Sequence, residues 1–344
     1  MKNKGAELIA EISANHCGSL NLAKRLIRCA KKNNADAVKI QTYTADTMTI
    51  KSDKKNFRIK NGIWKGYRLW DLYNEAYTPF EWHKELFEYS KKIGIQIFST
   101  PFDETAVDFL EELNCPRYKI ASFEMTDLPL IKKVAQTKKP IIISTGMGSL
   151  KEIEESFNTA NKYGAKDITL LYCVSNYPSK AEDYNMHNIS ILRKKFKCKI
   201  GFSDHSLDNR IAISAVATGA VMVEKHIALD NQIKGHDIKF STKGKVIKKF
   251  KDDILFASKL FQKDNFLRNK SEDKSKIFRR SIFAVNDIKK NQIFTSQNIR
   301  RIRPSNGVEP KYYFKLLGKK SPINISKETP ITKKILKQIN IKII

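Results

Sequence analysis

The chain has 344 residues, of which 41% are hydrophobic and 29% are charged, as is typical of a folded globular protein. These fractions exclude wholesale disorder and a long coiled coil, and no apolar run approaches the roughly 18 residues that a membrane-spanning helix needs. Glu7 and Glu11 interrupt the apolar stretch near the N-terminus, so we expect no secretory signal. Five scattered cysteines without a Cys-x-x-Cys pair indicate reduced thiols and a cytoplasmic location.

The net charge of +28 is distributed unevenly along the chain. Residues 241–344 hold 27 of the 64 basic residues and 8 of the 36 acidic ones, a net charge of +19. This asymmetry indicates a second module and raises nucleic-acid binding as an alternative function. We expect no interleaved surface aromatics in this stretch and find no RNA-recognition signature, so we favour a lysine-rich solvated surface whose field attracts small anionic substrates.

Short apolar segments rich in β-branched residues predict eight strands: Ala6–Ser13, Ala35–Tyr43, Gln96–Phe102, Arg117–Phe123, Pro140–Gly146, Asp167–Val174, Lys199–His205 and Ala220–Ile227. Most are continuous apolar runs, which is typical of parallel strands buried on both faces. Helical periodicity fills the gaps between them: Leu20–Lys32, Thr105–Leu113, Glu152–Tyr163 and Arg210–Thr218. This α/β alternation predicts a closed (β/α)8 TIM barrel, with a doubly wound open sheet as the alternative.

Residues 44–78, between the second and third predicted strands, are too long for a plain loop. They hold a cluster of aromatic side chains: Phe57, Trp64, Tyr67, Trp70, Tyr73 and Tyr77. An insertion after a barrel strand falls at the mouth of the active site, so we expect a lid or a binding loop here. Thr78-Pro79 is typical of a helix start with Thr78 as the N-cap.

The chain is expected to contain two domains. A barrel spans residues 1–263 and ends with a helix at Lys245–Leu260, and a polar linker spans 264–277. Residues 278–344 form a small module with short apolar pieces at Ser281–Val285, Ile293–Phe294 and Ile299–Ile302. A module of this size can need a partner surface for its stability.

Two lysines, Lys39 and Lys119, lie on apolar strands, where a cation needs an anion or a carboxylate partner to offset its desolvation. Hydroxyl side chains stand at or after strand ends: Thr100, Ser122, Ser144 and Ser203. Together these groups predict a cradle for a phosphate or a carboxylate. No Walker A or G-x-G-x-x-G motif is present, which disfavours nucleotide and dinucleotide cofactors.

His205 and His226 end the neighbouring seventh and eighth strands, so their imidazoles could share one divalent ion such as Mn²⁺ or Co²⁺. The alternative for each is a hydrogen bond at a strand end. His236 is a possible third ligand. His16 and His83 are interpreted as structural, and His187 as a surface residue.

Three carboxylates, Glu11, Glu124 and Glu224, are candidate general bases or orienting groups. Glu124 follows Ser122 by two residues, where it could position a water beside a bound phosphate or metal. The alternative for these carboxylates is an ion pair with a barrel lysine.

Seven short runs, taken in order, resemble the sialic acid synthase family. They are 10–16 (AEISANH), 38–42 (VKIQT), 98–102 (FSTPF), 118–124 (YKIASFE), 143–147 (ISTGM), 201–206 (GFSDHS) and 224–226 (EKH). Residues 300–307 (RRIRPSNG) resemble the antifreeze-like (SAF, β-clip) domain that follows the barrel in this family. The resemblance covers nearly the whole chain and implies a transferase that condenses phosphoenolpyruvate with an N-acetylated sugar.

The resemblance also implies roles for the candidate residues. Phosphoenolpyruvate would be held by Lys39, Thr100, Lys119, Ser122, Ser144 and Ser203. His205 and His226 would bind Mn²⁺, Co²⁺ or Mg²⁺, and the catalytic group would be completed by Glu11 and Glu124. The sugar would contact Tyr177, Glu224, Asp237 and Arg303, the last supplied by the other subunit of a domain-swapped homodimer.

The stretch 63–83 (IWKGYRLWDLYNEAYTPFEWH) is similar to the pseudaminic acid synthases within this family. The implied acceptor is 2,4-diacetamido-2,4,6-trideoxy-altrose, and its product could decorate flagellin or another glycoconjugate. The alternative is an N-acetylneuraminate or legionaminic acid synthase, whose acceptor has the mannose configuration. Cys17, His236 and Thr242–Lys245 depart from the family pattern near the edge of the sugar pocket.

Overall fold

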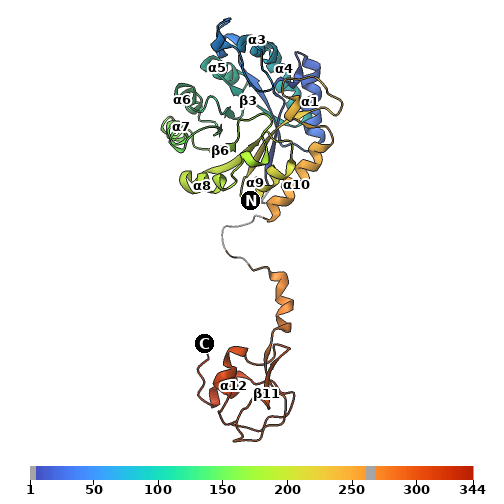
Figure 1. Ribbon diagram of the computed structural model, residues 1–344, viewed down its shortest axis with the longest axis vertical. Coiled ribbons are helices and arrows are strands. Elements are labelled where there is room, and N and C mark those ends of the chain that lie inside the picture. Colours follow the sequence, from blue (N-terminus) through green and yellow to red (C-terminus); the bar gives the residue numbers. More distant parts are fainter. Residues whose placement is uncertain (1–4, 261–265, 267, 344) are drawn as a thin grey trace. The chain divides into compact units, whose positions relative to one another are not determined.

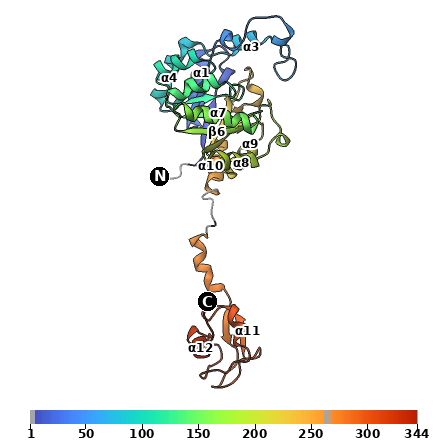
Figure 2. The same ribbon diagram turned by 90° about the vertical axis from the view of Figure 1, so that its left-hand side faces the viewer.

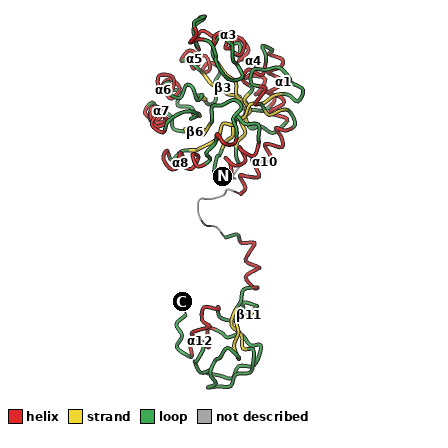
Figure 3. Tube along the Cα trace, viewed as in Figure 1, coloured by secondary structure: helices red, strands yellow, loops and turns green. Residues whose placement is uncertain are grey.

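A closed barrel of parallel strands forms the N-terminal unit, as predicted, and the open-sheet alternative is wrong (Figures 1 and 3). This computed structural model describes residues 5–260, 266 and 268–343. Within them the barrel strands are β1 (Glu7–Glu11), β2 (Ala37–Thr42), β3 (Gln96–Pro101), β4 (Tyr118–Ile120), β5 (Ile141–Ser144), β6 (Ile168–Cys173), β7 (Lys199–Asp204) and β8 (Met222–Ala228). Each strand pairs with the next, and β8 pairs with β1 to close the sheet. A short β9 (Thr242–Lys243) extends the pairing of β8.

Helices surround the strands, as Figure 3 shows in red around yellow. They are α1 (Leu20–Lys32), α4 (Phe80–Ile93), α5 (Glu104–Glu112), α6 (Leu128–Gln136), α7 (Leu150–Lys162), α8 (His187–Phe196), α9 (Asn209–Ala217) and α10 (Val246–Leu260). Each predicted helix is found within two residues of its expected ends. Short 3-10 turns occur at Ser13–His16, Ala181–Asp183 and Ile238–Phe240.

The helix α1 illustrates how the sequence sets the barrel core. The Ser19 hydroxyl caps its N-terminus by accepting from the Leu22 amide. The small and apolar residues Ala23, Leu26, Ile27 and Ala30 recur at helical spacing and are fully buried against the strands. Burying a Leu or Ile side chain stabilises a fold by about 1.5–3 kcal/mol, so this stripe holds the helix on the sheet.

The register of the strands brings the candidate residues to one end of the barrel. Glu11, the last residue of β1, stands opposite Lys39 of β2 and His226 of β8. Ser203 stands opposite Glu224. Because parallel strands all end at the same rim, their carboxyl ends gather the site.

The long insertion after β2 contains α2 (Ala45–Met48), a 3-10 turn (Lys55–Phe57) and α3 (Leu69–Ala76), and α3 stands at the periphery of the barrel (Figures 1 and 2). The predicted cap at Thr78 is wrong: α4 begins at Phe80 with Pro79 as its N-cap. The Thr78 hydroxyl is buried and lies 3.3 Å from His16 Nε2. The Thr78 hydroxyl therefore makes a tertiary contact with His16 instead of the predicted cap at the start of α4.

The second unit, Lys263–Ile344, has its own apolar core. Its strands β10 (Ser281–Ala284) and β11 (Ile299–Ile302) pair antiparallel, and α11 (Tyr313–Leu316), α12 (Lys333–Gln338) and a 3-10 turn (Pro310–Tyr312) complete it. In the expected linker 264–277, residues 264, 265 and 267 lie outside the described residues, and Lys270–Phe278 is an exposed 3-10 helix. No helix in the described parts of the chain is long and apolar enough to cross a membrane.

Candidate active site

Four buried charged side chains meet inside the barrel at the carboxyl end of its strands. Lys39 Nζ lies 2.6 Å from Glu11 Oε2 and 3.1 Å from Glu224 Oε1. Lys119 Nζ lies 2.9 Å from the same Glu224 oxygen. The ion pairs that we raised as the alternative for Glu11 and Glu224 are thus present, and each lysine has the carboxylate that its burial demands.

The environment of the two lysines differs. Burial alone would lower the pKa of Lys39, but the carboxylates of Glu11 and Glu224 outweigh burial and raise the pKa above its ordinary value. Burial lowers the pKa of Lys119, and Glu224 only partly offsets this while the charge of Lys39 adds to it. The pKa of Glu224 is lowered, because the two lysines outweigh its burial. An anion beside Lys119 would therefore stabilise its charged form.

Two of the four predicted hydroxyls, Thr100 and Ser203, contact this cluster. Thr100 Oγ1 accepts from Lys39 Nζ at 3.2 Å, and the Ser203 hydroxyl donates to Glu224 Oε1 at 3.5 Å. Ser122 Oγ accepts from the Gly146 amide at 3.2 Å, whereas the buried Ser144 Oγ has no hydrogen-bond partner. An unsatisfied buried hydroxyl is costly, so Ser144 fits a ligand-binding role.

Gly146 allows the hydroxyls of Ser122 and Ser175 to lie close to its backbone. A Cβ atom at this position would lie 2.2 Å from Ser175 Oγ and 2.8 Å from Ser122 Oγ. Any larger residue would push the serines apart. The glycine therefore leaves room for the hydroxyls of Ser122 and Ser175 beside the backbone that follows β5.

His205 and His226 come together as predicted, with their ring centroids 5.6 Å apart. His205 Nδ1 donates to the Val174 carbonyl at 3.0 Å, which leaves Nε2 free. His226 Nδ1 lies 3.5 Å from Asp237 Oδ2. These donors fit two protein ligands of a divalent ion whose other positions go to water or substrate. Across the described residues no cluster of three or more His, Cys, Asp or Glu side chains is placed to hold a metal, so His236 is not joined to the pair.

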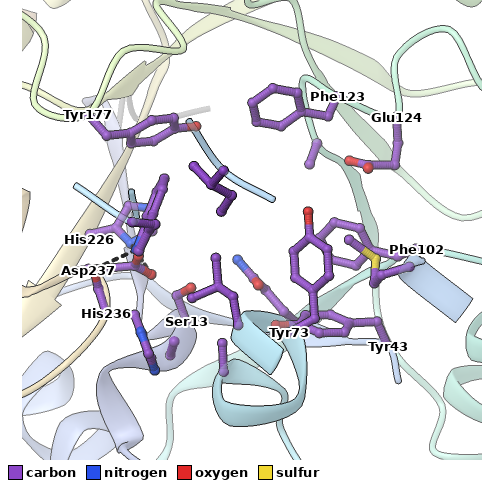
Figure 4. Close-up of a pocket in the computed structure, with 18 of the residues that line it drawn as sticks. Ser13, Tyr43, Tyr73, Phe102, Phe123, Glu124, Tyr177, His226, His236 and Asp237 are labelled. Carbon is purple, nitrogen blue, oxygen red and sulfur yellow. Dashed lines mark hydrogen bonds and ion pairs between the residues drawn. The ribbon is translucent and has the colours of Figure 1, made fainter. Parts of the chain in front are cut away.

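A cavity of about 270 Å³ opens beside His226 (Figure 4). Its polar residues are Ser13, Gln41, Glu124, His226, His236 and Asp237. Its apolar wall combines Met48, Ile59, Trp64, Leu72, Tyr73 and Ala76 of the insertion with Tyr43, Phe102, Phe123, Tyr177 and Phe240 of the barrel loops. The insertion therefore does line the mouth of the site, as its position after a strand predicted.

Glu124 lies across the cavity from Asp237 and His226 (Figure 4). Burial raises the pKa of its carboxyl to about 7, and nearby Asp127 adds to this. Its Oε2 is buried without a hydrogen-bond partner. A carboxyl group that titrates near neutral pH beside a cavity is suited to accept or donate a proton.

Several other residues have structural positions. The pKa values of His16 and His83 are lowered to about 4 by burial, and both rings are held by hydrogen bonds. His187 is exposed. Lys225 pairs with Asp204 at 2.9 Å and has no ion pair with the Lys39–Lys119 cluster. Arg303 follows β11 in the second unit and is exposed.

Sequence reasoning missed part of the pocket. Tyr43 and Phe102 directly follow β2 and β3, and their position after a strand end could have identified them. Phe240 ends the 3-10 turn Ile238–Phe240 after β8 and carries no such signal, yet its ring centroid lies 4.8 Å from that of His226 and 5.1 Å from that of Tyr177.

Comparisons with known proteins identify the family of the chain. The NeuB family matches residues 26–265, and the SAF domain matches residues 279–337. The chain is 41% identical over 323 residues to a pseudaminic acid synthase of Campylobacter jejuni, covering 94% of each chain. It is 39% identical over 316 residues to an N,N'-diacetyllegionaminic acid synthase of the same species, covering 91% of this chain and 94% of the relative.

A solved structure supports the same assignment. The N-acetylneuraminic acid synthetase of Leptospira borgpetersenii, in complex with citrate, superposes with a TM-score of 0.72 at 31% identity. The match covers 79% of this chain and 90% of that one. Family, relatives and fold thus agree over most of the sequence. The chain belongs to the NeuB family and carries the SAF domain after its barrel.

Proposed function

We propose that the protein condenses phosphoenolpyruvate with 2,4-diacetamido-2,4,6-trideoxy-altrose to give pseudaminic acid and phosphate. The observation that carries this proposal is the buried Lys39–Lys119 cluster. Its Glu11 accepts from the amide of Ser13, which lines the cavity together with His226 and Glu124. Similarity to a pseudaminic acid synthase over 94% of the chain supports the choice of reaction and acceptor.

Phosphoenolpyruvate is an anion with two charged groups, and the cluster offers matching partners. Lys39 and Lys119 supply the charges, and the hydroxyls of Thr100, Ser122, Ser144 and Ser203 supply hydrogen bonds. Their chemistry and the resemblance to the family support these residues as phosphoenolpyruvate ligands. Charge-assisted hydrogen bonds of this kind are about twice as strong as neutral ones.

The acceptor reacts as its open-chain aldehyde. His205 and His226 would hold a divalent ion, Mn²⁺, Co²⁺ or Mg²⁺, which as a Lewis acid makes the aldehyde carbon more electrophilic. The hydrogen bond from His205 Nδ1 to Val174 keeps Nε2 available as a ligand. Glu11 and Glu224 fix the two lysines and so set the position of phosphoenolpyruvate against the sugar.

The bond changes balance without a redox step. C3 of phosphoenolpyruvate attacks the aldehyde carbon, the aldehyde oxygen takes a proton, and C2 becomes an oxocarbenium ion. Water adds to C2 while Glu124 accepts its proton. The tetrahedral intermediate then expels phosphate by cleavage of the C2–O bond, which leaves the keto group of the product. The pKa of Glu124 near 7 suits it to this proton transfer.

The apolar wall supports the deoxy acceptor. A 6-deoxy, diacetamido sugar carries three methyl groups, and the insertion supplies Met48, Ile59, Leu72 and Ala76 to the cavity. Tyr177 and Asp237 also line the cavity and offer polar atoms to the sugar (Figure 4). A legionaminic or neuraminic acid synthase remains the second candidate, because a relative of the first kind is 39% identical.

We further propose that the enzyme works as a domain-swapped homodimer in the cytoplasm. The SAF domain would bring Arg303 to the sugar site of the other subunit, where its guanidinium would bind an acetamido group. The five free cysteines support a reducing compartment.

Labelled phosphoenolpyruvate tests the reaction. With ¹⁸O in the bridging C2–O–P position, C–O cleavage should deliver the label to phosphate and leave none in the sugar product. Label retained in the product, or release of pyruvate, would contradict the proposal. Addition of a chelator should stop turnover, Mn²⁺ should restore it, and His205→Ala should remain inactive with Mn²⁺.

A further inference from the structure

The insertion after β2 is braced internally. Asp53 Oδ1 lies 3.1 Å from both Arg58 and Arg68, and Arg68 pairs with Asp71 at 2.6 Å. The Ile59 amide donates to the Tyr67 carbonyl, and the Gly66 amide donates to the Ile59 carbonyl, both at 2.9 Å. The segment 53–71 is thus a folded unit whose position relative to the barrel depends on its outer contacts.

His236, in the loop after β8, contacts the insertion from the barrel. Its carbonyl accepts from Trp64 Nε1 at 3.2 Å, and its ring packs edge-on against Tyr67 at 6.0 Å. His236 Nε2 lies 3.5 Å from Glu75 Oε2, which also accepts from the Tyr67 hydroxyl at 3.3 Å. One residue therefore contacts three side chains of the insertion.

The location of His236 connects the insertion to the reacting groups. The next residue, Asp237, lies 3.5 Å from His226 and lines the cavity beside it (Figure 4). Trp64, which donates to the His236 carbonyl, also packs against Tyr177 with ring centroids 5.6 Å apart. Loosening His236 would thus displace the apolar wall and the loop of Asp237 relative to each other.

We propose that His236 is a positioning residue for acceptor specificity. It fastens the insertion over the cavity, so that the apolar side chains Ile59, Trp64 and Leu72 close on the methyl groups of the sugar. This inference rests on the proposed function for the identity of the sugar. The fastening itself is inferred from the contacts of His236 with Trp64, Tyr67 and Glu75 and does not depend on the identity of the sugar.

Kinetics of three variants test the role. His236→Ala removes the ring contacts, His236→Gln keeps a side-chain donor for Glu75, and His187→Ala removes an exposed histidine as a control. In His236→Ala the KM for the sugar should rise about tenfold while the KM for phosphoenolpyruvate stays within about twofold, and the preference for the 6-deoxy sugar over N-acetylmannosamine should fall. His236→Gln should recover most of this loss.

Hydrogen exchange tests the fastening without any sugar. The amides of 59–77 should exchange faster in His236→Ala than in His187→Ala, while the barrel strands exchange equally. If exchange rises but no sugar is turned over by the parent enzyme, the fastening stands and the proposed function fails. If His236→Ala matches His187→Ala in exchange and in the KM for the sugar, the inference is overturned.

Discussion

Lys119 Nζ lies 2.9 Å from Glu224 Oε1, and both side chains are buried in the barrel. The same oxygen also faces Lys39, so one carboxylate oxygen serves two cations. The three donors of Lys39 face Glu11, Glu224 and Thr100, whereas Lys119 keeps donors for a bound anion beside its bond to Glu224. This arrangement makes Lys119 the most direct test of the anion cradle.

We predict that Lys119→Met lowers kcat/KM for phosphoenolpyruvate about 100-fold or more, because a buried charge that pairs with the substrate is lost. Lys225→Met is the matched control, since Lys225 is equally buried and pairs with Asp204 instead. Both variants should lose unfolding free energy, about 3–5 kcal/mol for a broken buried pair. If the folded Lys225→Met protein lost phosphoenolpyruvate affinity to the same extent, the cradle would be misplaced.

Gly146→Ala should weaken phosphoenolpyruvate binding about tenfold or more, because the added Cβ collides with the hydroxyls of Ser122 and Ser175. Gly94→Ala is the control: Gly94 ends α4 with φ +72°, and a Cβ there has no neighbour closer than 3.7 Å. It should cost about 1 kcal/mol of stability and leave the KM unchanged. Thermal unfolding and initial rates for both variants separate the two effects.

Glu124 predicts a pH dependence. A base must be ionised to accept a proton, so kcat/KM should rise with pH through about 7, the pKa of Glu124, and Glu124→Gln should lose this limb together with most of the rate. A profile that falls through pH 7, with the limb removed by the same variant, would make Glu124 a general acid instead.

We also predict that the buried carboxylate of Glu124 lowers the stability of the fold while it supports activity. The pKa of Glu124 is raised from 4.5 to about 7 in the fold, so folding takes up a proton between these values and the charged carboxylate destabilises the fold above pH 7. Glu124→Gln should therefore raise the free energy of unfolding at pH 8 by up to roughly 3 kcal/mol, and have little effect at pH 4. Denaturant titrations at the two pH values measure the difference.

We predict that an Arg303 variant and a Lys119 variant restore activity to each other in mixed dimers. Arg303→Ala and Lys119→Met should each be inactive as homodimers, but their mixture should recover about a quarter of native activity if the sites are swapped, because half the dimers are mixed and each has one intact site. Lack of recovery in mixed dimers, verified by mass, would assign Arg303 to its own subunit or to no site.

Much of this site follows from sequence because barrels place strand ends predictably. Lys39, Thr100, Ser144 and Ser203 lie on apolar strands, and their position alone brings them to one rim. The bridging of two lysines by Glu224 could not be predicted, since it depends on register across the barrel interior. For the same reason the predicted cap at Thr78 is wrong: its hydroxyl lies 3.3 Å from Nε2 of His16, which is distant in sequence.

The pocket wall shows the same limit. The aromatic cluster of the insertion predicted a lining for the mouth, and Trp64 and Tyr73 do line it. Local sequence patterns cannot predict which residues hold the insertion in place, because Glu75 and His236 meet only in the folded chain. Contacts within a strand or helix period are encoded locally, whereas those between loops depend on the whole fold.

Phosphate release from phosphoenolpyruvate tests the central claim most directly. The assay contains Mn²⁺ and offers 2,4-diacetamido-2,4,6-trideoxy-altrose, its mannose-configured 2,4-diacetamido counterpart and N-acetylmannosamine separately, with a chelated control for each. We predict release with the altrose sugar and none after chelation. Release only with a mannose-configured sugar would keep the mechanism and overturn the acceptor, and no release with any sugar from folded, metal-loaded protein would contradict the account.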